Sequence, residues 1–116
     1  MTAEEVDGEV DSSLSVLRDQ IDAVDAQLVR LLGQRFALTR EVGHLKAMLG
    51  LPARDDVRES HQRLRLALLA EEQGVDAPTV LRGYDAIVER VVEEHEAIAA
   101  TEREALASAE PETPPR

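Results

Sequence analysis

The feature that most constrains the fold is an apolar stripe that runs through the first half of the chain at helical spacing. Its residues recur in steps of alternately four and three, which places them on one face of a single helix. We expect this helix to begin after the candidate caps Ser12 and Ser13 and to end at Leu49, because residues 50–52 read Gly-Leu-Pro. The stripe consists of Leu17, Ile21, Val24, Leu28, Leu31, Leu38, Val42, Leu45 and Leu49.

A helix of this length cannot bury its apolar stripe against the rest of its own chain. At about 1.5 Å per residue it exceeds roughly 50 Å, which is longer than a compact domain of this size is wide. The stripe therefore requires a partner, and the simplest partner is a second copy of the chain.

A second helix is predicted to open in the segment Asp-Asp-Val-Arg-Glu-Ser. Asp56 followed by Glu59 has the spacing of a capping box, and the helix is predicted to continue to Gln73. Gly74 is the expected C-terminal stop.

A third helix is predicted to start near Asp76, with Pro78 in its first turn. Its apolar stripe is interrupted by His95, as the first stripe is interrupted by Arg35. The predicted fold class is all-α, with three helices per chain, one of them very long, interlocked with a second copy as a helical dimer. The third stripe consists of Leu81, Tyr84, Val88, Val91, His95 and Ile98.

The length of 116 residues allows one domain at most. Residues 1–11 are predicted to be a disordered acidic arm, residues 12–103 the helical domain, and residues 104–116 a disordered Pro-rich tail. Only Phe36 and Tyr84 are aromatic, and Ala and Leu dominate, which is typical of a helical protein.

The charge balance narrows the classes of ligand. A formal net charge of −11, from 24 acidic and 13 basic residues, argues against nucleic acid and against an anionic membrane surface. A small anionic ligand would need a local cluster of cations. The absence of cysteine excludes thiol nucleophiles, disulfides and thiolate metal sites. No apolar run is long enough for a signal peptide or a membrane span, so we expect a cytoplasmic protein.

Arg35 is the exception in the first stripe. A buried unpaired guanidinium costs several kcal/mol, so either it reaches solvent or a carboxylate such as Glu59 or Glu94, or it meets a ligand. Lys46 follows eleven residues later, which places it on nearly the same face about 16 Å further along. Arg18 falls about 100° away around the helix and can serve a site across a helix–helix interface.

More charged residues gather where the second helix begins. The backbone N–H groups and the helix dipole favour anions at that point. Asp56 is most simply a cap and Arg58 a solvated charge when each is taken alone. The charged residues to be considered together are Arg54, Asp55, Arg58 and Glu59.

Taken in order, these residues resemble the all-helical chorismate mutase family, the AroQ class. The resemblance rests on "LRDQIDAVDAQLVRLLGQR", "EVGHLK" and "RDDVRE", and it covers about residues 14–98. It implies three helices that interlock with a second copy, and two equivalent sites that each borrow one arginine from the partner. Arg35 would then lie in the stripe because the stripe encloses a substrate carboxylate.

The resemblance also implies the site residues. The implied catalytic residues are Arg35, Lys46, Glu59 and His95. The implied substrate-binding residues are Arg18, Asp55, Arg58 and Val91.

The family reaction is the rearrangement of chorismate to prephenate within one molecule, which needs no cofactor, metal or nucleophile. It requires a fixed conformer of the dianionic substrate and donors at the ether oxygen, where negative charge develops. Arg35 and the partner's Arg18 would clamp carboxylates, a task for which lysine is a poor substitute. Lys46 would donate to the ether oxygen and a carboxylate, with His95 as the second ether donor.

The remaining residues would hold the other end of the substrate. Glu59 and the backbone near Asp55 would bind the ring hydroxyl, and Arg58 would bind a carboxylate or orient Glu59. Val91 and His95 stand where the relatives commonly carry Ser and a Gln or Glu. A four-residue insertion would move these places to His95 and Ala99.

This unusual third helix leaves alternatives open. One is a mutase of 4-amino-4-deoxychorismate in secondary metabolism, and another is an isochorismate–pyruvate lyase. A protein of a different class, a non-catalytic helical dimerisation module, would suit the apolar stripes and the caps. It would not explain Arg35, Lys46 and His95 in or beside those stripes.

Overall fold

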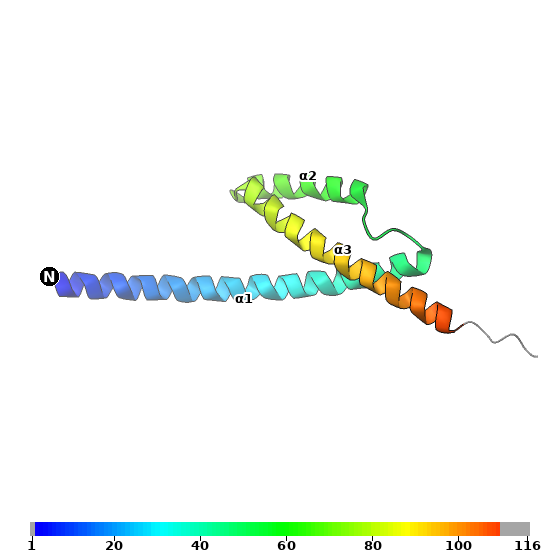
Figure 1. The fold of residues 1–116 in the computed structure, drawn as a ribbon. Helices are drawn as coiled ribbons and strands as arrows, with labels where there is room; N and C mark the ends of the chain where they lie inside the picture. The colour runs from blue at the N-terminus through cyan, green and yellow to red at the C-terminus, as the bar shows by residue number, and fades with distance from the viewer. Residues whose placement is uncertain (1, 110–116) are drawn as a thin grey trace, which may run out of the picture. The chain divides into compact units, whose positions relative to one another are not determined.

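The structure, a computed structural model, describes residues 2–109 and is built from helices. The long first helix, the three-helix count and the all-α class are confirmed within the described residues. Figure 1 shows the three helices, which are α1 (Ala3–Leu49), α2 (Asp56–Gln73) and α3 (Ala77–Ser108).

The predicted start of α1 is wrong, because the helix begins at Ala3 and not after Ser13. Thr2 and Glu5 form a capping box: the Glu5 N–H donates to Thr2 Oγ1 (3.2 Å) and the Thr2 N–H donates to Glu5 Oε2 (3.0 Å). Residues 3–11 of the predicted acidic arm therefore belong to α1. The signal, a threonine three residues before a glutamate, was present in the sequence.

The predicted ends of α1 and α2 are confirmed. Gly50 and Gly74 follow the two helices with φ of 66°, in the left-handed region that glycine adopts without steric cost. Beyond Gly74, the N–H of Val75 donates to the carbonyl of Ala70 at 2.8 Å. This bond satisfies a carbonyl that the end of the helix would otherwise leave unpaired.

The cap of α2 is Asp55 and not the predicted Asp56. Asp55 has extended backbone (φ −125°), and its side-chain oxygen accepts from the N–H of Arg58 at 3.0 Å. The predicted capping box with Glu59 does not form, because the Glu59 carboxylate accepts from Arg54 instead. Two adjacent aspartates offer the same local signal, and the choice fell one residue earlier.

The predicted start of α3 is confirmed and its end lies further on. Asp76 caps the helix, with Pro78 in the first turn. The helix runs to Ser108, so residues 104–108, predicted as part of a disordered tail, are helical. They include Glu, Ala and Leu, which favour helix. The rest of the predicted tail, residues 110–116, lies outside the described residues.

The chain divides into two units, residues 1–37 and residues 38–116. The first unit, within its described part, is the first stretch of α1, and its apolar stripe is open to solvent. The five members of the stripe in this unit, 54–62% exposed, are Leu17, Ile21, Val24, Leu28 and Leu31.

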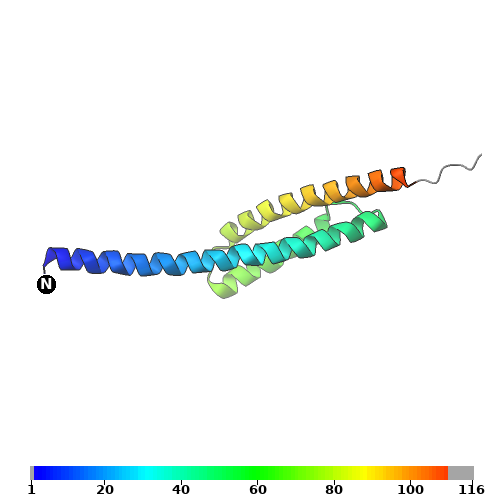
Figure 2. The ribbon, with the colours of Figure 1, turned by 90° about the horizontal axis from the view of Figure 1, so that it is seen from below.

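The second unit contains the end of α1 together with α2 and α3. Helices α2 and α3 run in opposite directions, joined through residues 74–76, and α3 lies along the end of α1 (Figures 1 and 2). Among the described residues the core is small: Ala70 (4% exposed) and Tyr84 (6%) are its buried apolar members. The one buried polar residue in the described chain is His95, also 4% exposed.

No helix among the described residues is long and apolar enough to cross a membrane.

The cap of α3 generates a stability prediction. Asp76 Oδ2 accepts from the backbone N–H of Thr79 (3.1 Å) and from its hydroxyl (2.6 Å). Asp76→Ala should lower the free energy of unfolding by about 1 kcal/mol, whereas Asp76→Asn keeps an acceptor and should lose much less. Urea unfolding at fixed protein concentration measures both variants. An equal loss in both would contradict the capping role.

Candidate active site

Two of the predicted site residues, Arg18 and Arg35, lie in residues 1–37. Arg18 is exposed on α1, and Arg35 is partly buried. Their predicted assignments to the site of one chain or of its partner stay predictions.

Lys46 lies in the last turn of α1 and is partly buried. Its Nζ donates to the backbone carbonyl of Ala53 at 3.0 Å. This bond holds the end of α1 against the segment that leads into α2. An ammonium group has three donors, so two remain for another acceptor.

The start of α2 contains an ion pair that orients a carboxylate. Arg54 Nη1 lies 3.0 Å from each carboxylate oxygen of Glu59. Glu59 is partly buried, and the pair fixes the direction of its carboxylate at the first turn of the helix. Arg54 was not among the predicted site residues, although it stands directly before the cap Asp55.

These contacts bring several of the predicted residues together. The bond from Lys46 to Ala53 places the ammonium beside the segment that carries Arg54, and Arg58 follows in the first turn of α2. The N-terminus of α2 adds the positive end of its dipole. Lys46, Arg54 and Arg58 thus stand among the carboxylates of Asp55, Asp56 and Glu59 at this end of the helix.

His95 is buried in the contact between α3 and the end of α1. Its Nε2 lies 2.6 Å from the carbonyl oxygen of Thr39. Its Nδ1 is buried and makes no hydrogen bond within the described residues. An added Cβ on Gly43 would lie 2.6 Å from His95 Cδ2, so the ring occupies the space that the glycine leaves open. Neither Thr39 nor Gly43 was assigned to the site from the sequence, although a glycine inside a helix was the available signal.

Val91 lies four residues before His95, on the same face of α3, and is partly buried. Its side chain carries no polar atom, so it can shape a pocket but cannot hydrogen-bond a ligand.

Other ion pairs join the same two helices around His95. His44 Nδ1 lies 3.3 Å from Glu102 Oε1, and Arg40 lies 4.0 Å from the Glu94 carboxylate. Within α3, Arg90 Nε also lies 3.4 Å from the Glu94 carboxylate. The first of these pairs is largely exposed and contributes little to stability.

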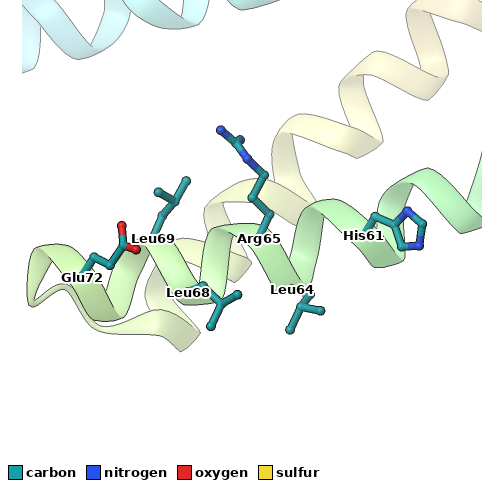
Figure 3. A pocket seen from close by; sticks show the side chains of 6 residues that line it. All are labelled: His61, Leu64, Arg65, Leu68, Leu69 and Glu72. Carbon is teal, nitrogen blue, oxygen red and sulfur yellow. The ribbon is translucent and has the colours of Figure 1, made fainter.

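A shallow hollow on α2 contains none of the predicted site residues. Figure 3 shows Leu64 and Leu68 projecting to one side of the helix and Arg65 to the other. The surface is an exposed, partly apolar helix face. Its lining residues are His61, Leu64, Arg65, Leu68, Leu69 and Glu72.

The fold and the site define a class: an all-helical protein with a group of charged residues at the end of one helix and the start of the next. The family model of chorismate mutase type II matches residues 17–96, which is 80 of the 116 residues. The chain therefore belongs to the chorismate mutase type II family. All eight predicted site residues, from Arg18 to His95, lie within the matched range.

Similar proteins carry related names. The chain is 29% identical over 76 residues to the chorismate mutase of Methanocaldococcus jannaschii, covering 66% of this chain and 77% of the relative. It is 42% identical over 64 residues to the T-protein of Enterobacter agglomerans, covering 55% of this chain and 17% of the relative. It is 35% identical over 79 residues to the bifunctional chorismate mutase/prephenate dehydratase of Escherichia coli (strain K12), covering 68% and 20%. The chain thus spans a fifth or less of the two longer relatives.

The burial of His95 predicts a large effect of its removal on stability. His95→Ala should lower the free energy of unfolding by about 2 kcal/mol or more, because a buried ring and its hydrogen bond are lost. His44→Ala is the matched control, since this exposed histidine on the same helix contact should cost less than about 0.5 kcal/mol. Urea unfolding of both variants compares them. Similar losses would contradict the packing described for His95.

Proposed function

We propose that this protein is a chorismate mutase that converts chorismate to prephenate. The observation that carries the proposal is the family match, because it includes all eight residues that the sequence predicts for the site. Lys46 in the last turn of α1 and Arg58 in the first turn of α2 support it, since chorismate is a dianion that needs cationic partners in an acidic protein.

The reaction makes a specific demand on the protein. The ether C–O bond breaks while a C–C bond forms in the same molecule, and no group leaves. Negative charge develops on the ether oxygen in the transition state. The protein must therefore hold the reactive conformer and place hydrogen-bond donors where that charge appears.

The carboxylates are assigned to arginines. Arg35 of one chain and Arg18 of the partner subunit would each hold a substrate carboxylate. A planar guanidinium can donate two parallel hydrogen bonds to a carboxylate, which fixes direction as well as charge. This clamp would restrict the substrate to the reactive conformer.

The ether oxygen is assigned to Lys46 and His95. Lys46 has two donors beyond the one that it gives to Ala53, so it can meet the ether oxygen and a carboxylate while staying tied to the loop. His95 is the second ether donor. Lys46 lies in the last turn of α1, and His95 lies on the α3 face that packs against the end of α1.

The ring hydroxyl is assigned to Glu59 and the backbone near Asp55. Arg54 occupies one hydrogen-bonding position on each Glu59 oxygen, and a carboxylate has about four such positions, so Glu59 can still accept from a hydroxyl. Arg58 would bind a carboxylate or help to orient Glu59, and Val91 would form the apolar wall.

We further propose that the protein works as a homodimer with shared active sites. The exposed apolar stripe of residues 17–31 and the exposed face of α2 with Leu64 and Leu68 support a partner, since such surfaces are costly to leave in water. A second copy supplies the same surfaces and the borrowed Arg18. A cytoplasmic location stays a prediction.

The alternative functions are less well supported. The relative from Methanocaldococcus jannaschii, of which the chain spans 77%, is named a chorismate mutase, and the matched family has the same name. The product assay described next distinguishes chorismate mutase activity from the three alternatives. These are action on 4-amino-4-deoxychorismate, elimination of pyruvate from isochorismate, and a dimer without catalytic activity.

The proposal predicts the product of a direct assay. Purified protein given chorismate, isochorismate or 4-amino-4-deoxychorismate should form prephenate from chorismate with the highest kcat/KM, as followed by NMR. Preference for the amino compound, or release of pyruvate from isochorismate, would contradict the assigned substrate.

Arg35→Ala should lower kcat/KM by about 100-fold or more with unchanged helical circular dichroism, because it removes one carboxylate clamp. A loss of only a few-fold would remove Arg35 from the site.

Sharing of sites predicts recovery of activity when two inactive variants are mixed. Arg18→Ala and Lys46→Ala, unfolded and refolded together at equal concentration, should regain about a quarter of wild-type activity. Half of the dimers are then mixed, and each mixed dimer has one intact site. Arg35→Ala mixed with Lys46→Ala is the control, because both residues would serve the site of one chain and no intact site can form. Recovery in the control, or none in the test pair, would contradict the proposed sharing.

A further inference from the structure

We propose that Gly43 and the carbonyl of Thr39 form a slot that fixes the His95 ring, with Nδ1 left as the nitrogen that meets the substrate. Gly43 is then a positioning residue that acts through His95. The inference rests on the proposed function for its catalytic consequence. The orientation of the ring stands on the contacts alone.

The contact with Thr39 determines which nitrogen of the His95 ring carries the hydrogen. A carbonyl oxygen can only accept a hydrogen bond, so the 2.6 Å contact to Thr39 requires a hydrogen on His95 Nε2. In the neutral ring the other nitrogen, Nδ1, then carries a lone pair and no hydrogen. The contact with α1 therefore selects one of the two neutral forms of the histidine.

The His95 ring fills the space that Gly43 leaves open beside it. A Cβ on Gly43 would lie 2.6 Å from His95 Cδ2, 3.1 Å from its Nε2 and 3.0 Å from Ile98 Cδ1. Any side chain at this position would force the ring away from Thr39. Gly33, in the same helix, has no atom within 4 Å of its added Cβ, so the crowding is particular to Gly43.

The Nδ1 atom of His95 is the ring nitrogen that remains for a ligand. His95 is 4% exposed, and its Nδ1 is buried without a hydrogen-bond partner in the described part of the chain. Leaving a buried polar atom unpaired costs roughly 1–3 kcal/mol, which a bound ligand can recover. Lys46, the proposed donor to the ether oxygen, lies one helical turn beyond Gly43 on a neighbouring part of the same face.

The proposed role in the reaction requires a particular charge state of the His95 ring. An ether oxygen and a carboxylate only accept, so Nδ1 can serve either of them only in the protonated ring. With Nε2 held by Thr39, His95 acts as a donor to the substrate as an imidazolium and not as a neutral ring. Accordingly kcat should decline as the pH rises, because the neutral ring has no hydrogen on Nδ1 to donate. The ionisable groups in the ion pairs beside this helix contact are Arg40, His44, Arg90, Glu94 and Glu102, and Lys46 lies in the last turn of α1.

The orientation can be tested without any assay of activity. Long-range ¹H–¹⁵N NMR spectra of the wild-type protein at high pH distinguish the two neutral forms of each histidine. We expect His95 with its hydrogen on Nε2, and a mixture of the two forms in Gly43→Ala. A hydrogen on Nδ1 of the wild-type ring would overturn the inference. His95→Gln assigns the His95 signals, because it removes them.

The catalytic consequence is tested by a double-mutant cycle with chorismate. Gly43→Ala should lower kcat about tenfold or more with less than a threefold change in KM, since the arginine clamps are untouched, and Gly33→Ala should stay within about twofold. In a His95→Ala background, adding Gly43→Ala should change kcat less than about twofold. A full, additive loss there would show that Gly43 acts independently of His95 and would overturn its positioning role.

The pH profile separates this inference from the proposed function. The decline of kcat with rising pH should persist in His44→Gln, which keeps His95, and disappear in His95→Gln. A profile that is flat in the wild-type protein, or that rises with pH, would overturn the donor role of Nδ1. Absence of prephenate formation by the wild-type protein would instead contradict the proposed function, while the NMR result would still decide the orientation of the ring.

Discussion

The contact between His95 and Gly43 is the interaction on which the second unit most depends. Among the described residues only Ala70 and Tyr84 are buried apolar residues, so the unit has a small core to hold its helices. The hydrogen bond from His95 to Thr39 reaches directly from α3 to the backbone of α1. It is possible only because Gly43 has no side chain. A polar ring therefore takes a place that an apolar side chain occupies in most helix contacts, at the cost of one unpaired nitrogen.

The start of α2 brings cations and carboxylates together in fixed positions. Lys46 is held by Ala53, Asp55 caps α2, and Arg54 fixes Glu59, so the charged groups around the start of α2 are ordered by contacts within the chain. Ordering before a ligand arrives reduces the entropy that binding must remove and the reorganisation that a transition state would require. The same contacts consume little of the donor capacity, since an ammonium and a carboxylate each have positions to spare.

The exposed apolar stripe links folding to the proposed catalysis. A helix face with Leu17, Ile21 and Leu28 in water gives association a driving force that is roughly proportional to the apolar area covered. If a second copy covers it, the partner that stabilises the helix also carries the second arginine to the substrate. Stability and activity would then share one dependence on protein concentration.

The sequence by itself determined the local features. The period of the apolar residues predicted three helices, and Gly50, Gly74 and Pro78 marked their ends and starts correctly, because a helix and its stop signals depend on residues a few positions apart. The predicted start of α1 and the predicted cap of α2 were wrong, because the sequence offers more than one local capping signal at each place. The ring orientation of His95 was decided only by the tertiary structure. Thr39 and Gly43 lie more than 50 residues away in the chain, and periodicity does not encode which atoms of two packed helices meet.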